Sequence, residues 1–349
     1  MRKPMRAGGD PQAFSDRARG GLLGLCVGDA LGATYENRRL PVPPFPQLCD
    51  GPLREPTGGG PNRLLPGQVS DAAQLGVCLG LSLREIRRYD PEETARRYAT
   101  WRELRVPTGP TTSAVLDQLR QSRGVWNTAA REHWLRHSKQ PCDNGSLVRT
   151  APIGVFLARE DQPRARASLE DSALTHYDPR CQLACAALNG AIAKALTSPR
   201  PPTVDDLFQG ASTALSIAGA MLGATMKDQV RDVLEASAAL KADLVLARGP
   251  DPQLYGPDFH LHTQGDHVRV AFRLAFWEAA HAPSFEAGLL DVANRGGDSG
   301  GNGAVAGALL GALHGESQLP DRWRKAVLEA PHGPHELYHP RNLLPLVDA

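Results

Sequence analysis

The sequence predicts an all-α fold, a compact multi-helix domain. Apolar residues recur at helical spacing along most of the 349 residues, and convincing alternation of apolar and polar residues, which would indicate strands, is absent. Glycine recurs at every fourth position near both ends of the chain, at 20, 24, 28 and 32 and again at 303, 307, 311 and 315. Each stripe lies on one helix face and lets another backbone approach closely. In a membrane such stripes would suggest helix dimerisation, but Asp29 and the polar flanks argue against a membrane, so for each stripe we expect close helix packing in a soluble core.

The predicted elements follow in order along the chain. Residues 1–13 are expected to be a flexible N-terminus, Ser15 to cap a helix over 16–31, and 41–67 to form a Pro/Gly-rich loop. Residues 14–330 form the predicted helical domain, 250–264 a surface loop, and 331–349 a weakly structured C-terminal tail. Between the first helix and the tail, helices are predicted at 70–88, 91–105, 110–122, 126–137, 145–158, 179–197, 203–222, 227–241, 266–281, 284–292, 302–314 and 320–330.

Composition excludes several function classes. The 39 Lys and Arg nearly balance 38 Asp and Glu, so the net charge of +1 predicts no strong general affinity for nucleic acid and no membrane partner. The N-terminus has basic residues but no apolar core, so we expect neither a signal peptide nor an anchor. The six cysteines form no CxxC pair and fall mostly within apolar helical patterns. Buried free thiols are typical of a reducing compartment, so we expect a cytoplasmic protein.

Four separated stretches, read in order, resemble one family. They are Gly21 to Glu36, which ends in Ala-Leu-Gly-Ala-Thr-Tyr-Glu; Ser70-Asp71-Ala72-Ala73-Gln74; Asn144-Gly145-Ser146-Leu147-Val148-Arg149-Thr150-Ala151-Pro152, followed by Thr175-His176; and Asn294-Arg295-Gly296-Gly297-Asp298-Ser299-Gly300-Gly301. Together they resemble the ADP-ribosylglycohydrolase family, whose all-helical hydrolases release ADP-ribose from modified proteins or nucleic acids. The resemblance extends from Gly21 to Gly315.

The resemblance implies a metal site that this sequence only partly retains. Family members hold two Mg²⁺ or Mn²⁺ ions with carboxylates and a hydroxyl at two helix starts, because hard ions need several oxygen ligands. The implied metal ligands here are Ser70, Asp71 and Asp298, and the implied catalytic residues are Glu36, Asp71 and Asp298. Three further ligand positions are lost, since they hold Ala72, Gly300 and Gly301. We therefore expect one ion at most, with no ion as the alternative.

The resemblance also implies a cradle for an ADP-ribose-type ligand. Its expected residues are Asn144, Gly145, Ser146, His176, Gly296, Gly297, Ser299 and Gly300. Backbone amides at a helix start can bind a diphosphate, and glycines let a ligand approach the backbone.

Each of these residues also has a purely structural interpretation. Ser70-Asp71 is a common helix cap, Glu36 can be a solvated loop residue, and Asp298 can satisfy amides of a Gly-rich turn. His176 and Arg149 can be structural, and for Arg149 an ion pair is favoured over a phosphate contact. Three histidines have spacing compatible with zinc but are favoured as exposed loop residues: His260, His262 and His267.

Two hypotheses for function follow. The first is a hydrolase of an ADP-ribosyl linkage to a protein, nucleic acid or small molecule, with a reduced metal site or with Glu36 and a second carboxylate acting without metal. The second is an inactive family member that binds ADP-ribose, a related nucleotide or a protein partner. A different glycosidic substrate is a third alternative, because function depends on the site and not on the fold.

Overall fold

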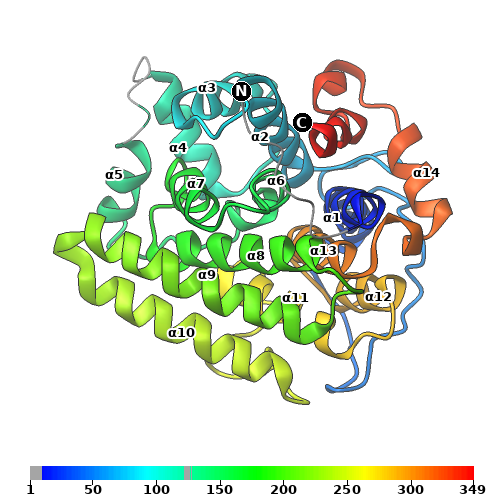
Figure 1. Cartoon of the computed structure of the whole chain (residues 1–349). Coiled ribbons are helices and arrows are strands. Elements are labelled where there is room, and N and C mark those ends of the chain that lie inside the picture. Colours follow the sequence, from blue (N-terminus) through cyan, green and yellow to red (C-terminus); the bar gives the residue numbers. More distant parts are fainter. Residues whose placement is uncertain (1–9, 122–125, 127) are drawn as a thin grey trace.

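The computed structural model describes residues 10–121, 126 and 128–349, and in this part the regular secondary structure is almost entirely helical, as predicted (Figure 1). The α-helices are α1 (Pro11–Gly32), α2 (Asp71–Ile86), α3 (Pro91–Arg102), α4 (Pro110–Gln121), α5 (Ala129–Arg136), α6 (Ala151–Phe156), α7 (Asp161–Ala173), α8 (Pro179–Thr197), α9 (Val204–Thr225), α10 (Val230–Arg248), α11 (Val268–His281), α12 (Phe285–Arg295), α13 (Ser299–His314) and α14 (Asp321–Glu329).

The two glycine stripes pack against each other along α1 and α13, side by side in Figure 1. A Cβ at Gly24 would lie 2.1 Å from the carbonyl oxygen of Gly307, and a Cβ at Gly303 would lie 2.4 Å from that of Gly28. No side chain fits at such distances, so the glycines are required by backbone contact. This contact brings a helix near the start of the chain next to one near its end. The ends of both helices line the cleft described below.

The first helix begins earlier than predicted. Asp10, not Ser15, is its N-cap, and the Asp10 carboxylate accepts a hydrogen bond of 2.9 Å from the amide of Gln12. Pro11 follows at the first helical position, where proline is favoured. Residues 10–13, expected to be flexible, are thus a cap and the start of a helix, and residues 1–9 lie outside the described part of the chain.

A short antiparallel pair fixes the ends of these helices next to each other. β1 (Arg38–Arg39) follows α1 and pairs with β2 (Gly296–Gly297), which precedes α13, with Arg38 opposite Gly297. Gly296 and Gly297 have φ of +74° and +67°, which favours glycine. The pairing brings the segment after α1 to the N-terminus of α13.

One helical prediction needs correction, and one helix was not predicted. The helix predicted over 145–158 is split into a 3-10 turn, Leu147–Arg149, and the short α6, whose first turn holds Pro152. Helix α7 was not predicted, because it buries Arg164, Ser168 and Asp171 beside alanines and so lacks an apolar stripe. Part of the helix predicted over 126–137 lies outside the described residues, and α5 covers the rest.

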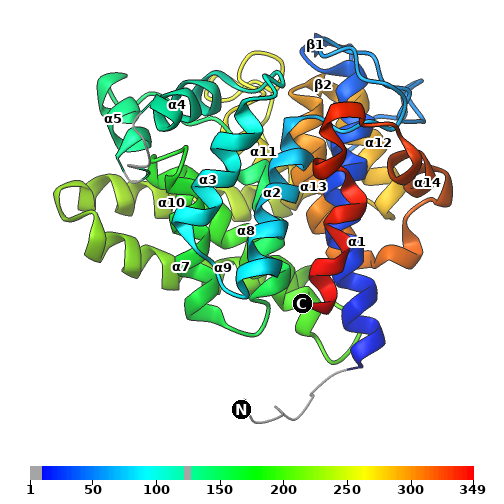
Figure 2. The same ribbon diagram turned by 90° about the horizontal axis from the view of Figure 1, so that it is seen from above.

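The C-terminal tail is folded, which contradicts the expectation of weak structure. It forms 3-10 helices Gly333–Tyr338, Pro340–Asn342 and Leu344–Asp348, and both views show it (red) beside α1 and α2 (Figures 1 and 2). Leu343 and Leu346 are buried. The tail was misjudged because its few apolar residues, separated by prolines and histidines, have no helical period.

Helix α9 is long and apolar enough to cross a membrane by length and composition alone. Core helices of soluble proteins pass the same test. In this structure α9 contacts α8 and α10, and 39% of its apolar window is buried. One such helix is weak evidence for a membrane span.

Candidate active site

A cleft of 490 Å³ opens where the ends of α1 and β1 meet the starts of α2 and α13. The loops 107–110, 143–145 and 261–266 complete its wall. Among the described lining residues there is no lysine or arginine, whereas five carboxylates line it: Glu36, Asp71, Asp143, Asp266 and Asp298. The described lining is therefore acidic although the whole chain has a net charge of only +1.

Ser70 and Asp71 form the start of α2, and they both cap the helix and line the cleft. The Ser70 hydroxyl accepts from the amide of Ala72 at 3.4 Å and donates to Asp29 Oδ1 at 2.6 Å. Thr108 donates to the Asp71 carboxylate. Burial raises the pKa of Asp71, and the charge of Asp298 adds to this, while the Thr108 and Ser70 hydrogen bonds oppose it.

Asp29 stabilises the start of α2 by accepting hydrogen bonds from its backbone. Its Oδ2 accepts from the amides of Ser70 at 2.9 Å and Ala73 at 3.1 Å. Burial raises the pKa of Asp29 to about 7 against these hydrogen bonds. Sequence reasoning did not select Asp29 as a site residue, although a carboxylate within the apolar Gly21–Gly32 helix was a signal.

Glu36 and Asp298 meet at the start of α13. Glu36 Oε2 accepts from the amide of Gly300 at 2.6 Å, and Asp298 Oδ1 accepts from the amide of Gly301 at 3.4 Å. Burial raises the pKa of Glu36 well above its ordinary value, and the charge of Asp298 and a hydrogen bond between the two carboxyl groups raise it further. Glu36 is not a solvated loop residue.

The glycines at 300 and 301 leave room for these two carboxylates. A Cβ at Gly300 would lie 2.9 Å from Glu36 Oε2, and a Cβ at Gly301 would lie 2.7 Å from Asp298 Oδ2. The amides of Gly300 and Gly301 are thus hydrogen-bonded by the chain's own acidic side chains. Gly300 lines the cleft, but its amide is already occupied in this arrangement.

The opposite wall carries Asp143 and Asn144, and Asp143 was missed by sequence reasoning. Asn144 Nδ2 donates to Asp298 Oδ2 at 2.5 Å, which links the two walls. Asp143 Oδ1 lies 2.6 Å from His176 Nε2, and Thr111 donates to its other oxygen. Burial alone would raise the pKa of Asp143, but His176 and Thr111 lower it to about 2.

Comparison with known proteins shows which family this chain belongs to. The family model described as ADP-ribosylglycohydrolase matches residues 10–345, nearly the whole chain. The chain belongs to the ADP-ribosylglycohydrolase family.

Relatives and a solved structure agree with this assignment. The chain is 24% identical over 334 residues to an ADP-ribosylarginine hydrolase, Tri1, of Pseudomonas putida, covering 92% of this chain and 77% of that protein. It is 32% identical over 174 residues to the ADP-ribosyl-[dinitrogen reductase] glycohydrolase of Rhodospirillum rubrum, covering 50% and 55%. A solved structure titled ADP-ribosylglycohydrolase-related protein complex superposes with a TM-score of 0.68 at 25% identity, covering 97% of this chain and 99% of that chain.

Within this ADP-ribosylglycohydrolase fold, only some of the predicted ligand residues line the cleft. Asn144, Gly145, Gly297 and Gly300 do so. Ser299 is buried and donates to the carbonyl of Gly32 at 2.7 Å, so its side chain serves the contact between α1 and α13.

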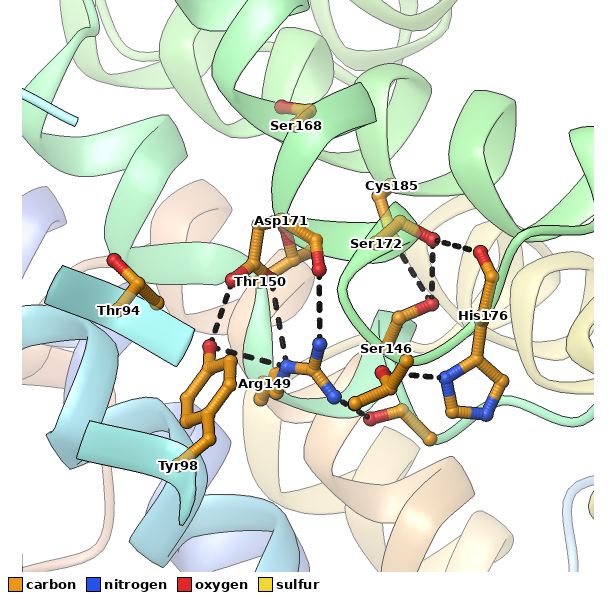
Figure 3. Close-up of polar contacts among 12 residues, drawn as sticks. Thr94, Tyr98, Ser146, Arg149, Thr150, Ser168, Asp171, Ser172, His176 and Cys185 are labelled. Atoms are coloured by element: carbon orange, nitrogen blue, oxygen red, sulfur yellow. Dashed lines mark hydrogen bonds and ion pairs between the residues drawn. The ribbon is translucent and has the colours of Figure 1, made fainter. Parts of the chain in front are cut away.

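Two of the predicted ligand residues, Ser146 and His176, belong to the buried polar network drawn in Figure 3. Ser146 is fully buried and accepts from Ser172 at 2.9 Å, so its hydroxyl does not face the cleft. His176 is buried with Nδ1 2.8 Å from the Thr175 hydroxyl and reaches the cleft only through Asp143. Gly296 lies in β2, outside the lining.

Arg149 is structural, as the sequence favoured. Its guanidinium is fully buried, pairs with Asp171 at 3.4 Å and donates to the Tyr98 hydroxyl at 3.1 Å (Figure 3). A further bond of 3.2 Å to the carbonyl of Gly145 ties this buried network to the cleft wall.

The three histidines with zinc-like spacing serve separate local roles. His262 Nε2 contacts the carbonyl of Arg295 at 2.7 Å, and His260 Nδ1 accepts from the amide of His262. His267 caps α11. All three are half-buried, so the expectation of exposed loop histidines was only partly right.

Proposed function

We propose that this family member hydrolyses the glycosidic bond between ADP-ribose and an arginine side chain of a modified protein. The family assignment and the names of the relatives support an ADP-ribosyl hydrolase function at the coarser level. The observation that carries the finer proposal is the ring of five carboxylates with no lysine or arginine in the described lining. Such a cleft favours a substrate whose reacting end bears a positive charge, and a guanidinium is always charged and matches carboxylates geometrically.

Different carboxylates suit different steps. Asp143, whose pKa is lowered to about 2, stays ionised at neutral pH and can accept hydrogen bonds from a guanidinium or a ribose hydroxyl. Glu36, whose pKa is raised by burial and by Asp298, can hold a proton for the departing nitrogen. Groups whose surroundings drive their pKa values apart are the usual acid and base pairs of hydrolases.

The donor set fits one hydrated hard cation better than two. Among the described residues, Glu36, Asp71 and Asp298 do not bring three ligand oxygens within 4.8 Å of one another. Mg²⁺ commonly binds through one or two carboxylates and keeps several waters, so Asp71 and Asp298 with the Ser70 hydroxyl suit a single ion. When bound, such an ion would polarise ribose hydroxyls and lower the pKa of a bound water. The raised pKa of Asp71 is consistent with a site that gains by binding a cation.

Binding without turnover is the second candidate, and the N-terminus of α13 favours it. Gly300 and Gly301 lack the ligands that the family resemblance implies, and their amides already donate to Glu36 and Asp298. In this alternative the ligand binds without metal and is not cleaved.

The test combines calorimetric titration with ADP-ribose, with and without Mg²⁺ or Mn²⁺, and a hydrolysis assay on arginine-ADP-ribosylated protein. We expect metal-dependent turnover that falls by at least about 100-fold in Asp298→Ala. Because Asp298 also caps α13, the matched control is Ser284→Ala, which removes the cap of α12 outside the cleft and should retain full turnover. Metal-independent binding without turnover would support the second candidate, and no binding with no turnover would contradict both.

A further inference from the structure

A second group of ligand atoms lies behind the cleft wall, apart from the five carboxylates. It consists of Cys142, directly before Asp143, together with Asp178, the N-cap of α8, and Cys181 in the first turn of that helix. The three residues are buried, with exposed fractions of 6%, 2% and 0%. The chain therefore brings two thiols and a carboxylate from two segments into one water-poor place.

The spacing of these atoms matches a tetrahedral metal site. The sulfur atoms of Cys142 and Cys181 are 3.9 Å apart, and with a carboxylate oxygen of Asp178 all three ligand atoms lie within 4.8 Å of one another. Tetrahedral zinc with bonds of about 2.3 Å to sulfur places two thiolates roughly 3.8 Å apart. The observed sulfur separation is therefore close to that of two zinc-bound thiolates.

The neighbouring charges balance a divalent cation. Asp178 accepts from Trp134 Nε1 at 3.0 Å and from Arg180 Nε and Nη2 at 2.9 and 2.8 Å. Two thiolates and one carboxylate offset one guanidinium and one divalent ion, which leaves the buried group neutral. The Arg180 side chain is 33% exposed, so it has room to release one carboxylate oxygen.

We propose that Cys142, Asp178 and Cys181 bind one soft divalent cation of the zinc class, separate from the hard-ion site of the cleft. Thiolates select zinc-like ions, whereas the carboxylates of the cleft suit magnesium. On binding, each thiol loses its proton to solvent and its sulfur forms a bond to the ion, so one ion displaces two protons. A water molecule completes the four-coordinate shell.

Such an ion would stabilise the loop that forms this wall of the cleft. Cys142 adjoins Asp143 and Asn144, while Asp178 follows His176 by two residues. The ion therefore links the loop that carries Asp143 to the segment that carries its partner His176. We expect the metal to raise the melting temperature, because it binds only the folded state.

The experiment uses the full chain, stripped of metal by a chelator and kept reduced by a phosphine, with excess Mg²⁺ to fill the hard-ion site. Co²⁺, which accepts tetrahedral zinc ligands, is titrated while the near-ultraviolet thiolate-to-cobalt absorption is recorded, and Zn²⁺ is then added in competition. We expect one Co²⁺ per chain, displaced by Zn²⁺, with no absorption in Cys142→Ser or Cys181→Ser. In Asp178→Asn the affinity should fall about tenfold or more.

The matched control is Cys185→Ser, which alters another buried thiol of α8 that contacts Ser146 instead. It should retain the absorption and the stoichiometry. No thiolate absorption in the folded wild-type chain at saturating Co²⁺ would overturn the proposal, whether or not the variants fold. Absorption that survives in Cys181→Ser would overturn it as well.

Discussion

Individual carboxylates of the cleft behave differently because their partners differ. Asp143 has a histidine and a threonine hydroxyl as partners, which lower its pKa to about 2 despite burial. Glu36 has a second acid, Asp298, as its neighbour, so its pKa rises. Both residues line one cleft, and the direction of each shift depends on which side chains lie within hydrogen-bonding distance.

A pH-dependent effect on stability follows for Asp143. A carboxyl whose folded-state pKa is about 2 and whose ordinary value is 3.8 stabilises the fold above about pH 4, and that contribution is lost as the pH falls toward 2. We expect Asp143→Asn to lower the free energy of unfolding at pH 7 by about 2 kcal/mol, and the difference from wild type to shrink at acidic pH. Denaturant titrations at pH 7, 5 and 3 measure it.

Asp50→Asn is the control, because Asp50 forms an exposed ion pair with Arg54 and such pairs contribute little. Its effect should stay within about 0.5 kcal/mol at every pH. A difference for Asp143→Asn that grows on acidification would contradict the assignment.

At the scale of elements, the contact of α1 with α13 determines where the site lies. The helices touch through backbone at Gly24 and Gly28 on one side and Gly303 and Gly307 on the other. Any side chain there would separate the helices and displace the segments that carry Glu36 and Asp298.

We expect Gly24→Ala to destabilise the fold by about 1–3 kcal/mol or more, since its Cβ would lie 2.1 Å from the carbonyl oxygen of Gly307. Gly21→Ala lies on the same helix, but its Cβ would lie 3.4 Å from its nearest neighbour, the carbonyl oxygen of Ala308, so it should cost much less. Chemical denaturation of both variants compares them. Equal midpoints would show that the two helices adjust freely.

The folded C-terminal tail leads to a second prediction for an element. Leu343 is 1% exposed, and a Cβ at Gly80 of α2 would lie 2.4 Å from Leu343 Cδ1. We expect Leu343→Ala to cost about 2–5 kcal/mol, as for other buried leucines. Leu337→Ala in the same tail is the control, because Leu337 is 57% exposed. Thermal unfolding followed by circular dichroism measures the melting temperatures of both variants. If the tail is packed against α2, only Leu343→Ala lowers the melting temperature.

At the scale of the whole molecule, the described helices share one continuous core. Buried residues of the core extend from Ala18 in α1 to Leu346 in the tail, so the first and last segments are held together. All six cysteines are buried and form no disulfide, and the cytoplasmic location expected from the sequence stays a prediction.

This continuity predicts a single cooperative unfolding transition. Four tryptophans are buried in different parts of the core, so their fluorescence reports on separate regions: Trp101, Trp134, Trp277 and Trp323. Tryptophan fluorescence and far-ultraviolet circular dichroism should give coincident denaturation curves. Two separated transitions would mean that the chain contains more than one folding unit.

The sequence by itself determined the all-α class and most helix positions. Helical period, prolines at helix starts and the two glycine stripes are local signals, and local signals suffice when each helix buries an apolar face. The order of the four motifs was enough to indicate the family. The sequence also identified Glu36, Asp71 and Asp298, which line one cleft in the structure.

Tertiary structure alone decided which way side chains face and what they contact. Ser146 and Ser299 stand within motifs, but both hydroxyls point into helix contacts, and Asp143 lines the cleft while contacting His176 from another segment. The tail and α7 escaped prediction because their contacts come from distant helices and not from their own period. These contacts join residues that are far apart in the chain. A single sequence carries no local signal for such contacts.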